Sequence, residues 1–224
     1  FDYLSVRYSV PVDTADAFYR IFGLDRAEAL LAAFEKHPPI TVHTNTLKLS
    51  REELLSRVPG ATPTKNAPFG VVLPSDAPLH ALISEGLCFV QDEASQICVE
   101  ALGATAGDRV LDLCSAPGGK STDLAASLRE MFGDRFLLVT NEVMKQRVGI
   151  LADNMALWGD PNVVVTSDDP SAFASLPGFF DVIVADVPCS GEGMFRKDEE
   201  AQNQWSEDNV SLCEARQRRI VADV

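Results

Sequence analysis

The first 86 residues mix helical and strand-like hydrophobic patterns. Apolar residues recur at near-helical spacing from 13 to 34, with a break at Gly23. The segment 40–49 alternates apolar and polar side chains, which predicts a half-buried strand. The segment 50–58 begins with a serine and carries a glutamate three residues later, a spacing that predicts a capped helix. We therefore expect a small N-terminal α+β domain over residues 1–86.

A different pattern begins at residue 87 and continues to residue 224. Short apolar runs typical of buried strands occur at 109–113, 136–140, 162–166 and 179–186. Helical patterns alternate with them at 91–102, 118–129, 143–158 and 171–176, and a further helix is expected up to Arg219. Alternating strands and helices with near-continuous apolar strands predict an α/β fold with a parallel sheet covered on both faces. The second predicted domain is therefore 87–224.

Composition places the chain among ordinary globular proteins. It has 224 residues, of which 46% are hydrophobic and 23% charged. Its apolar runs are far shorter than the roughly 18 residues of a membrane span, and the chain opens FDYLSVRYSV without a basic-then-apolar leader. Five cysteines without a C-x-x-C pair, and only three histidines, argue against a disulfide framework and a metal site. We expect a soluble cytoplasmic protein with no membrane or metal partner.

The charge is strongly acidic, which bears on a nucleic-acid partner. The chain has 19 Lys and Arg against 33 Asp and Glu, a net charge of −14. Because such a chain is repelled by phosphate at long range, RNA binding would need local basic patches or segments outside this chain. Arg196 and Lys197 form one such patch, and our hypothesis is that they contact RNA phosphate, although short basic clusters are more often solvated faces.

The first candidate for chemistry is the loop after the strand at 109–113. Two adjacent glycines, Gly118 and Gly119, let the backbone approach a ligand closely, and the helix that follows offers free amide groups at its start. This pattern favours a nucleotide-like ligand, and the alternative is a tight turn without a ligand. The loop matches neither G-x-G-x-x-G nor G-x-x-x-x-G-K-[ST], which disfavours a nicotinamide-dependent dehydrogenase.

Acidic residues follow the next two strands. Glu142 ends the second strand, where a carboxylate can accept both hydroxyls of a ribose. Asp168 and Asp169 follow the third strand, where a carboxylate could receive an adenine amino group. Each of them alone is more often a solvated loop residue. Their placement after consecutive strands of one sheet favours a cofactor site.

The strongest chemical signal is the segment that begins at Asp186. Pro188 restricts the backbone so that Cys189 is presented at the carboxyl end of the sheet. Carbon 5 of cytosine becomes nucleophilic after a thiolate adds to carbon 6, and a carboxyl group at the N3 and amino edge favours that addition. Asp186 and Cys189 are the candidates for these roles. The alternative for Cys189 is a buried structural thiol.

Four motifs resemble the Sun/nucleolar-protein family of S-adenosylmethionine-dependent RNA cytosine-5 methyltransferases. They are NTLK at 45–48, QDEAS at 91–95, DLCSAPGGKS at 112–121 and DVPCSGEGMFRKD at 186–198, the last in the spelling of bacterial small-subunit rRNA members. The resemblance implies a Rossmann-like methyltransferase fold, S-adenosylmethionine as cofactor and 16S rRNA as substrate. Transfer RNA is the alternative substrate, and a catalytically silent module that binds cofactor or RNA is the alternative function.

The resemblance also implies roles for individual residues. The methionine and ribose part of the cofactor would be held by Cys114, Ser115, Ala116, Pro117, Gly118, Gly119 and Lys120. Glu142 would bind the ribose hydroxyls, Asp169 rather than Asp168 the adenine, and Asp186 would lie between cofactor and cytosine.

The chain departs from the family pattern in one respect. In the family a Thr-Cys motif on a later strand supplies the attacking thiol, and the thiol of the proline-cysteine motif assists product release. No Thr-Cys dipeptide occurs here, so both roles stay open for Cys189, and we expect this chain alone to be inactive and its sheet to stop after the fourth strand. The strand at 180–185 would then be an exposed apolar edge, which predicts that the protein continues or that its last helix or another chain covers the edge.

Overall fold

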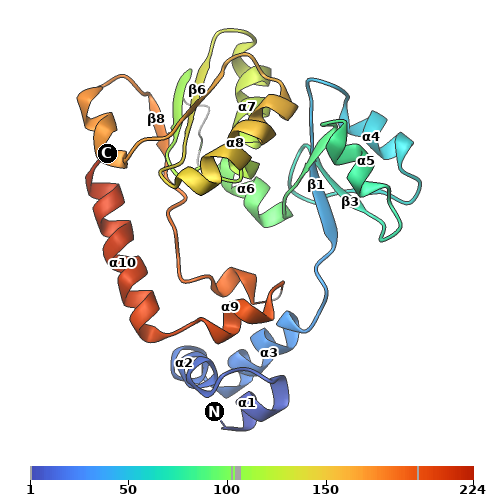
Figure 1. Ribbon diagram of the computed structural model, residues 1–224. Helices are drawn as coiled ribbons and strands as arrows, with labels where there is room; N and C mark the ends of the chain where they lie inside the picture. Colours follow the sequence, from blue (N-terminus) through green and yellow to red (C-terminus); the bar gives the residue numbers. More distant parts are fainter. Residues whose placement is uncertain (1, 102, 104–106, 196) are drawn as a thin grey trace. The chain divides into compact units, whose positions relative to one another are not determined.

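The computed structural model describes residues 2–101, 103, 107–195 and 197–224. The chain divides into two compact units, Phe1–Pro38 with Pro188–Arg219, and Pro39–Val187 with Ile220–Val224 (Figure 1). Within the described ranges, no helix is both long enough and apolar enough to cross a lipid bilayer.

The first unit is helical. It contains α1 (Asp2–Tyr8), α2 (Val12–Phe22), α3 (Leu24–Phe34), the 3-10 helix η2 (Glu192–Met194), α9 (Glu199–Asn203) and most of α10 (Glu207–Ala222). The predicted break at Gly23 is confirmed, because this glycine has φ 73° between α2 and α3. Helices α1 and α9 were not predicted.

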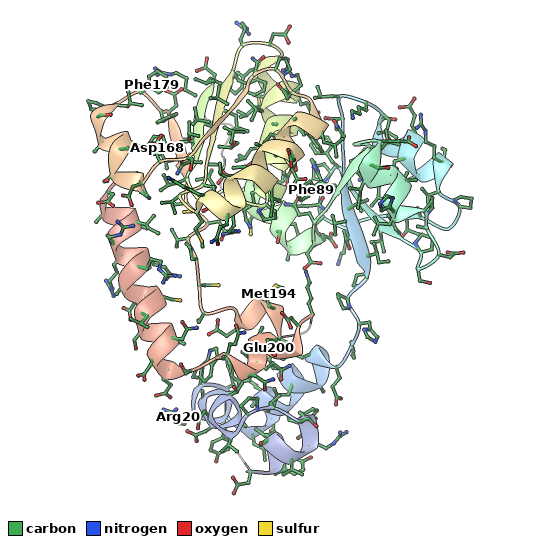
Figure 2. All side chains as sticks on the ribbon, viewed as in Figure 1. Arg20, Phe89, Asp168, Phe179, Met194 and Glu200 are labelled. Carbon is green, nitrogen blue, oxygen red and sulfur yellow. The ribbon has the colours of Figure 1, made fainter. Side chains whose placement is uncertain are left out.

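Aromatic packing joins the two chain segments of this helical unit. The ring of Phe195 lies 6.3 Å from that of Phe18 and 6.0 Å from that of Phe34. At its surface, Arg20 of α2 forms an ion pair with Glu207 of α10 (Figure 2). Apolar contact therefore orders the segment after residue 188 against the start of the chain.

The second unit begins with an antiparallel sheet of order β2-β3-β1-β4. Its elements are β1 (Ile40–Thr44), α4 (Arg51–Arg57), β2 (Thr62–Pro63), β3 (Gly70–Leu73), α5 (Leu79–Ser84) and β4 (Cys88–Val90). The capped helix is confirmed, since Ser50 and Glu53 exchange the two hydrogen bonds of a capping box. The strand β4 pairs with β1, so this sheet extends past residue 86, and the proposed boundary at 86/87 remains a prediction.

A parallel sheet of order β7-β6-β5-β8 follows in the same unit. Its elements are α6 (Glu93–Ala101), β5 (Arg109–Asp112), α7 (Gly119–Phe132), β6 (Leu137–Asn141), α8 (Lys145–Trp158), β7 (Val163–Thr166), the 3-10 helix η1 (Pro170–Ser175) and β8 (Val182–Val184). Leu124 and Leu128 of α7 are fully buried with Leu138 of β6 in its core. The predicted α/β class, a Rossmann-like parallel sheet preceded by a small α+β region, is confirmed.

The fourth strand differs from its predicted extent of 179–186. It covers only Val182–Val184, because it pairs on one side alone, with β5 in register Val110 to Val182. Ile183 is 38% exposed, and a cavity of about 350 Å³ runs along residues 182–186. This edge therefore has no strand partner among the described residues.

Candidate functional site

The loop between β5 and α7 requires a glycine at its last position. Gly118 has φ 114°, a conformation that other residues rarely adopt, and it forms the N-cap of α7. A Cβ atom at this position would lie 2.7 Å from Cε of Met155 in α8. The backbone conformation therefore requires glycine here, while the end of the Met155 side chain would have to move to admit a Cβ atom.

Ser115 ties this loop to the neighbouring strand. Its backbone N–H donates to the carbonyl of Asn141 at 2.8 Å, and its hydroxyl donates to the carbonyl of Asp112 at 2.7 Å. The same hydroxyl accepts from the N–H of Asn141 at 3.0 Å. Ser115 is 5% exposed, so these bonds are shielded from water.

Asn141, at the end of β6, joins the loops after β5 and β7 through one amide group. Its Nδ2 donates to the carbonyls of Leu113 (3.2 Å) and Asp168 (2.9 Å), while its Oδ1 accepts from the N–H of Asp168 (3.0 Å) and the hydroxyl of Thr166 (2.9 Å). The sequence reading missed this residue. Its signal was a polar side chain at the carboxyl end of an apolar strand, directly before Glu142.

Helix α8 supports the loop from the other side. The guanidinium of Arg147 donates to the carbonyl of Ala116, and Nδ2 of Asn154 donates to the carbonyl of Pro117 at 2.7 Å. Neither residue was predicted to belong to the site. The backbone of the loop is therefore held by side chains from two elements before any ligand binds.

Two side chains at the start of the loop have raised pKa values. Burial raises the pKa of Asp112 to about 6, even though the hydroxyl of Ser121 donates to its Oδ2 at 2.6 Å. The other carboxylate oxygen of Asp112 is buried without a hydrogen-bond partner. Burial also raises the pKa of the Cys114 thiol to about 11. Cys114 is therefore a protonated thiol at neutral pH, unsuited to nucleophilic attack.

The predicted ribose and adenine ligands already have partners in the chain. Glu142 is 3% exposed, and its carboxylate accepts from the N–H of Met144 at 2.8 Å and lies 3.3 Å from Arg147. Asp169 caps η1 by accepting from the N–H (3.1 Å) and hydroxyl (2.8 Å) of Ser171. Asp168 is exposed at the loop after β7 (Figure 2). Their ligand roles remain predictions.

Asp186 lies in the loop after β8, two residues beyond the end of that strand, rather than at the strand end as expected. Its carboxylate accepts from Nζ of Lys120 at 2.7 Å, across 66 positions of sequence. Both residues line the cavity of about 350 Å³ beside β8. The structure therefore brings Asp186 to the glycine loop at the start of α7.

The remaining predicted residues belong to the helical unit. Cys189 is exposed, and the carbonyl of Pro188 before it accepts from Gln217 of α10 at 2.9 Å. Lys197 is exposed and lines a cavity of about 560 Å³ together with Tyr8 and Phe34. Arg196 falls outside the described residues.

The chemistry at the ends of β5, β6 and β7 suits an uncharged or cationic nucleoside. Asp112, Glu142 and Asp168 contribute carboxyl groups there, which accept from hydroxyl and amino groups and repel phosphate. The unpartnered oxygen of Asp112 is one free acceptor. In the described part of the chain, no three His, Cys, Asp or Glu side chains gather as metal ligands would. The residues present fit a sulfonium nucleoside better than a dinucleotide.

Comparison with known proteins agrees with this assignment. Residues 99–224 match the family described as 16S rRNA methyltransferase RsmB/F. Among curated relatives, the ribosomal RNA small subunit methyltransferase F of Serratia proteamaculans is 41% identical over 139 residues, 61% of this chain and 28% of the relative. The protein of the same name from an Enterobacter species is 34% identical over 207 residues, 87% of this chain and 42% of the relative. The chain spans less than half the length of these relatives.

Solved structures resemble nearly the whole chain. A methyltransferase homolog protein from Pyrococcus horikoshii is 25% identical and superposes with a TM-score of 0.80, covering 98% of this chain and 70% of its own. NSun6 from the same organism, solved with SFG, has a TM-score of 0.79 at 15% identity and covers 95% of this chain and 79% of its own. The second likeness supports the fold alone.

Proposed function

Because the chain belongs to the RsmB/F family of 16S rRNA methyltransferases, we propose that it acts in methyl transfer from S-adenosylmethionine to carbon 5 of a cytosine in 16S rRNA. Dependence on S-adenosylmethionine, predicted from the sequence, is confirmed for the family. The choice of carbon 5, the RNA substrate and a cytoplasmic location next to ribosomal RNA are our proposals for this chain.

The cofactor is proposed to bind along the loop 114–120 and the ends of β5 and β6. Bound there, it supplies an electrophilic methyl group on a positively charged sulfur. The backbone of the loop, held by Asn141 and Arg147, provides a fixed surface for the methionine part. Glu142 is proposed to accept from the ribose hydroxyls and Asp169 from the adenine amino group. The carboxyl groups at this edge favour a cation electrostatically.

We propose that Asp186 and Cys189 act on the cytosine that receives the methyl group. Asp186 would hold the N3 and amino edge of cytosine, with its carboxylate oriented by Lys120. A thiol that adds to carbon 6 makes carbon 5 nucleophilic, and after methylation the C5 proton leaves and the thiolate is expelled. Cys189 is the thiol of this segment, and it would act either in the addition or in the expulsion.

The observation that carries this proposal is the 2.7 Å ion pair between Lys120 and Asp186, because it holds the first residue of the motif 186–198 beside the start of α7. The test is incubation with methyl-labelled S-adenosylmethionine and purified 16S rRNA, followed by nucleoside analysis. Since no Thr-Cys dipeptide occurs in this chain, we expect label in 5-methylcytosine only if Cys189 is the attacking thiol, and we expect Asp186→Asn then to lower it by about 100-fold or more. Labelled transfer RNA in place of 16S rRNA would correct the substrate, and cofactor binding without transfer to either RNA would favour the silent module.

The role of Cys189 is separable with RNA that contains 5-fluorocytosine. Such a base has no C5 proton to lose, so a thiol that has added to carbon 6 remains covalently attached. An adduct that disappears in Cys189→Ser assigns the addition to Cys189. With ordinary cytosine in the RNA, an adduct that accumulates in Cys189→Ser but not in the wild type assigns Cys189 the expulsion, and no adduct with either RNA contradicts the addition.

A further inference from the structure

The turn at residues 45–48 has no role in the site described above, yet its side chains make buried and charged contacts. Asn45 follows β1 and is fully buried. Its Nδ2 donates to the carbonyl of Gly86 at 2.8 Å and to the carbonyl of Trp158 at 2.9 Å, while its Oδ1 accepts from the N–H of Leu47 at 3.1 Å. The amide of Asn45 thus connects the antiparallel sheet to the end of α8.

Lys48, three residues after Asn45, also connects this sheet region to the end of α8. Its Nζ donates to the carbonyl of Glu85 at 2.8 Å and to the carbonyl of Leu157 at 3.0 Å. Leu157 and Trp158 are the last residues of α8, where carbonyls lack partners within the helix and the helix dipole is negative. Asn45 and Lys48 therefore cap α8 from 113 and 109 positions away in sequence.

Two neighbouring features show that this contact is closely fitted. Gly86 has φ 65°, and a Cβ atom there would lie 2.4 Å from Nζ of Lys48 and 2.6 Å from the carbonyl oxygen of Leu157. The ring of His43 in β1 stacks on Trp158, with 5.3 Å between centroids and 10° between planes. The end of α8 is thus held by β1, by the turn after it and by the turn before β4.

The rest of α8 contacts the proposed cofactor loop. Arg147 and Asn154 donate to the carbonyls of Ala116 and Pro117, and Met155 lies against Gly118. A helix of 14 residues moves largely as one rigid rod, so a shift at its last turn displaces these contacts. We propose that Asn45 and Lys48 are positioning residues for cofactor binding, acting through α8 on the loop 114–118; this rests on the proposed cofactor site.

The test uses Lys48→Met, because Lys48 is exposed and methionine keeps the length of the side chain without its charge. Asn45→Ala is avoided because it opens a fully buried site and endangers folding. Calorimetry with S-adenosylhomocysteine measures affinity, and amide hydrogen exchange of residues 113–118 measures order in the loop. We expect Lys48→Met to bind about 3- to 10-fold more weakly and its loop to exchange faster. Lys48→Arg, which keeps the charge and the donors, is expected to restore both.

Ser50→Ala is the matched control. It removes the cap of α4 in the same sheet region without touching α8, so it is expected to lower the unfolding temperature and to leave both affinity and loop exchange unchanged. Unchanged affinity and exchange in Lys48→Met, or an equal loss in Ser50→Ala, would overturn the proposal. Glu142→Gln distinguishes failure of the capping role from failure of the cofactor site. If Glu142→Gln weakens cofactor binding while Lys48→Met does not, only the capping role fails. If it also binds normally, the assigned cofactor site fails.

Discussion

Two segments that follow strands of the same parallel sheet differ sharply in how they are held. The loop 113–118 after β5 is largely buried, and hydrogen bonds from Asn141, Arg147 and Asn154 fix its carbonyls. In the segment 185–190 after β8, Ala185, Asp186, Pro188 and Cys189 are exposed. Single side chains contact that segment: Lys120 donates to the carboxylate of Asp186, and Gln217 donates to the carbonyl of Pro188.

This difference fits the proposed division between a small cofactor and a large acceptor. A preformed site binds a small molecule without an added cost of ordering the backbone. Segments that admit a large partner are drawn from the less stable parts of a structure, since they must open and close around it. We expect substitutions in the first region to affect folding and cofactor affinity, and substitutions in the second to affect only reactivity and RNA binding.

The largest effect is expected from Gly118→Ala. A side chain at φ 114° adds backbone strain of about 1–3 kcal/mol, and the end of the Met155 side chain must move aside. Urea denaturation measures the loss, and calorimetry with S-adenosylhomocysteine measures the accompanying loss of affinity. Gly149→Ala in α8 is the control, because nothing lies within 4 Å of the added Cβ and alanine favours the helix by about 1 kcal/mol. Equal stability of the two variants would contradict the close fit at Gly118.

The next effect is a pH dependence of stability that comes from α7, the helix after the loop 113–118. Burial, assisted by the charge of Glu100, raises the pKa of Asp123 in α7 to about 8, and burial lowers the pKa of its neighbour His43 to about 3. Nε2 of His43 lies 3.5 Å from Oδ1 of Asp123, and we regard both groups as neutral at pH 7 because both are desolvated. The carboxyl group therefore holds a proton that it would lose in the unfolded chain.

The sign of this effect follows from proton binding. Asp123 has a higher pKa folded than unfolded, so its stabilisation is complete below about pH 4 and is lost as pH rises toward 8. Between pH 6.5 and 8 the remaining titration of His43 in the unfolded chain, whose ordinary pKa is about 6.5, opposes this loss, and the free energy of unfolding should fall by about 1 kcal/mol. Urea denaturation across this range should show the fall in the wild type and a slight rise in Asp123→Asn. A flat wild-type profile would contradict the neutral pair.

Thiol reactivity compares the two segments directly. Cys189 is exposed, whereas Cys114 is half-buried with a pKa raised to about 11. Because the thiolate is the reactive form, we expect iodoacetamide to label Cys189 at least about 10-fold faster than Cys114 at pH 8. Peptide mass spectrometry over time gives both rates, with the exposed Cys98 as a control for access alone. Equal rates for Cys114 and Cys189 would remove the contrast between the two loops.

The smallest effect is expected from Lys197→Ala in the helical unit. Loss of one phosphate contact should weaken binding to a 16S rRNA fragment about twofold and reduce the salt dependence of binding by about one ion. Filter binding at several salt concentrations measures both quantities. Lys65→Ala, at an exposed position of the antiparallel sheet region, is the control for a change of charge alone. An unchanged salt dependence would exclude Lys197 from the RNA surface.

Elements with signals confined to a few neighbouring residues were predictable. The capping box of Ser50 and Glu53, the break at Gly23 and the glycine turn at 118 each depend on local backbone conformation. The alternation of apolar runs and helical patterns also predicted the parallel sheet. Strands that are buried on both faces are apolar along nearly their whole length, as these runs are. The predicted length of the strand at 179–186 was too great, because hydrophobicity does not show which strand of a sheet lacks a neighbouring strand on one side.

The arrangement of the site was decided by tertiary structure. The sequence by itself determined the fold class and which residue types stand after which strands. It could not show that Asn141 joins the loops after β5 and β7, that Lys120 meets Asp186, or that Asn45 and Lys48 cap α8. Each of these contacts joins residues more than 25 positions apart, and a hydrogen bond at that separation depends on how the elements pack rather than on the residues beside it.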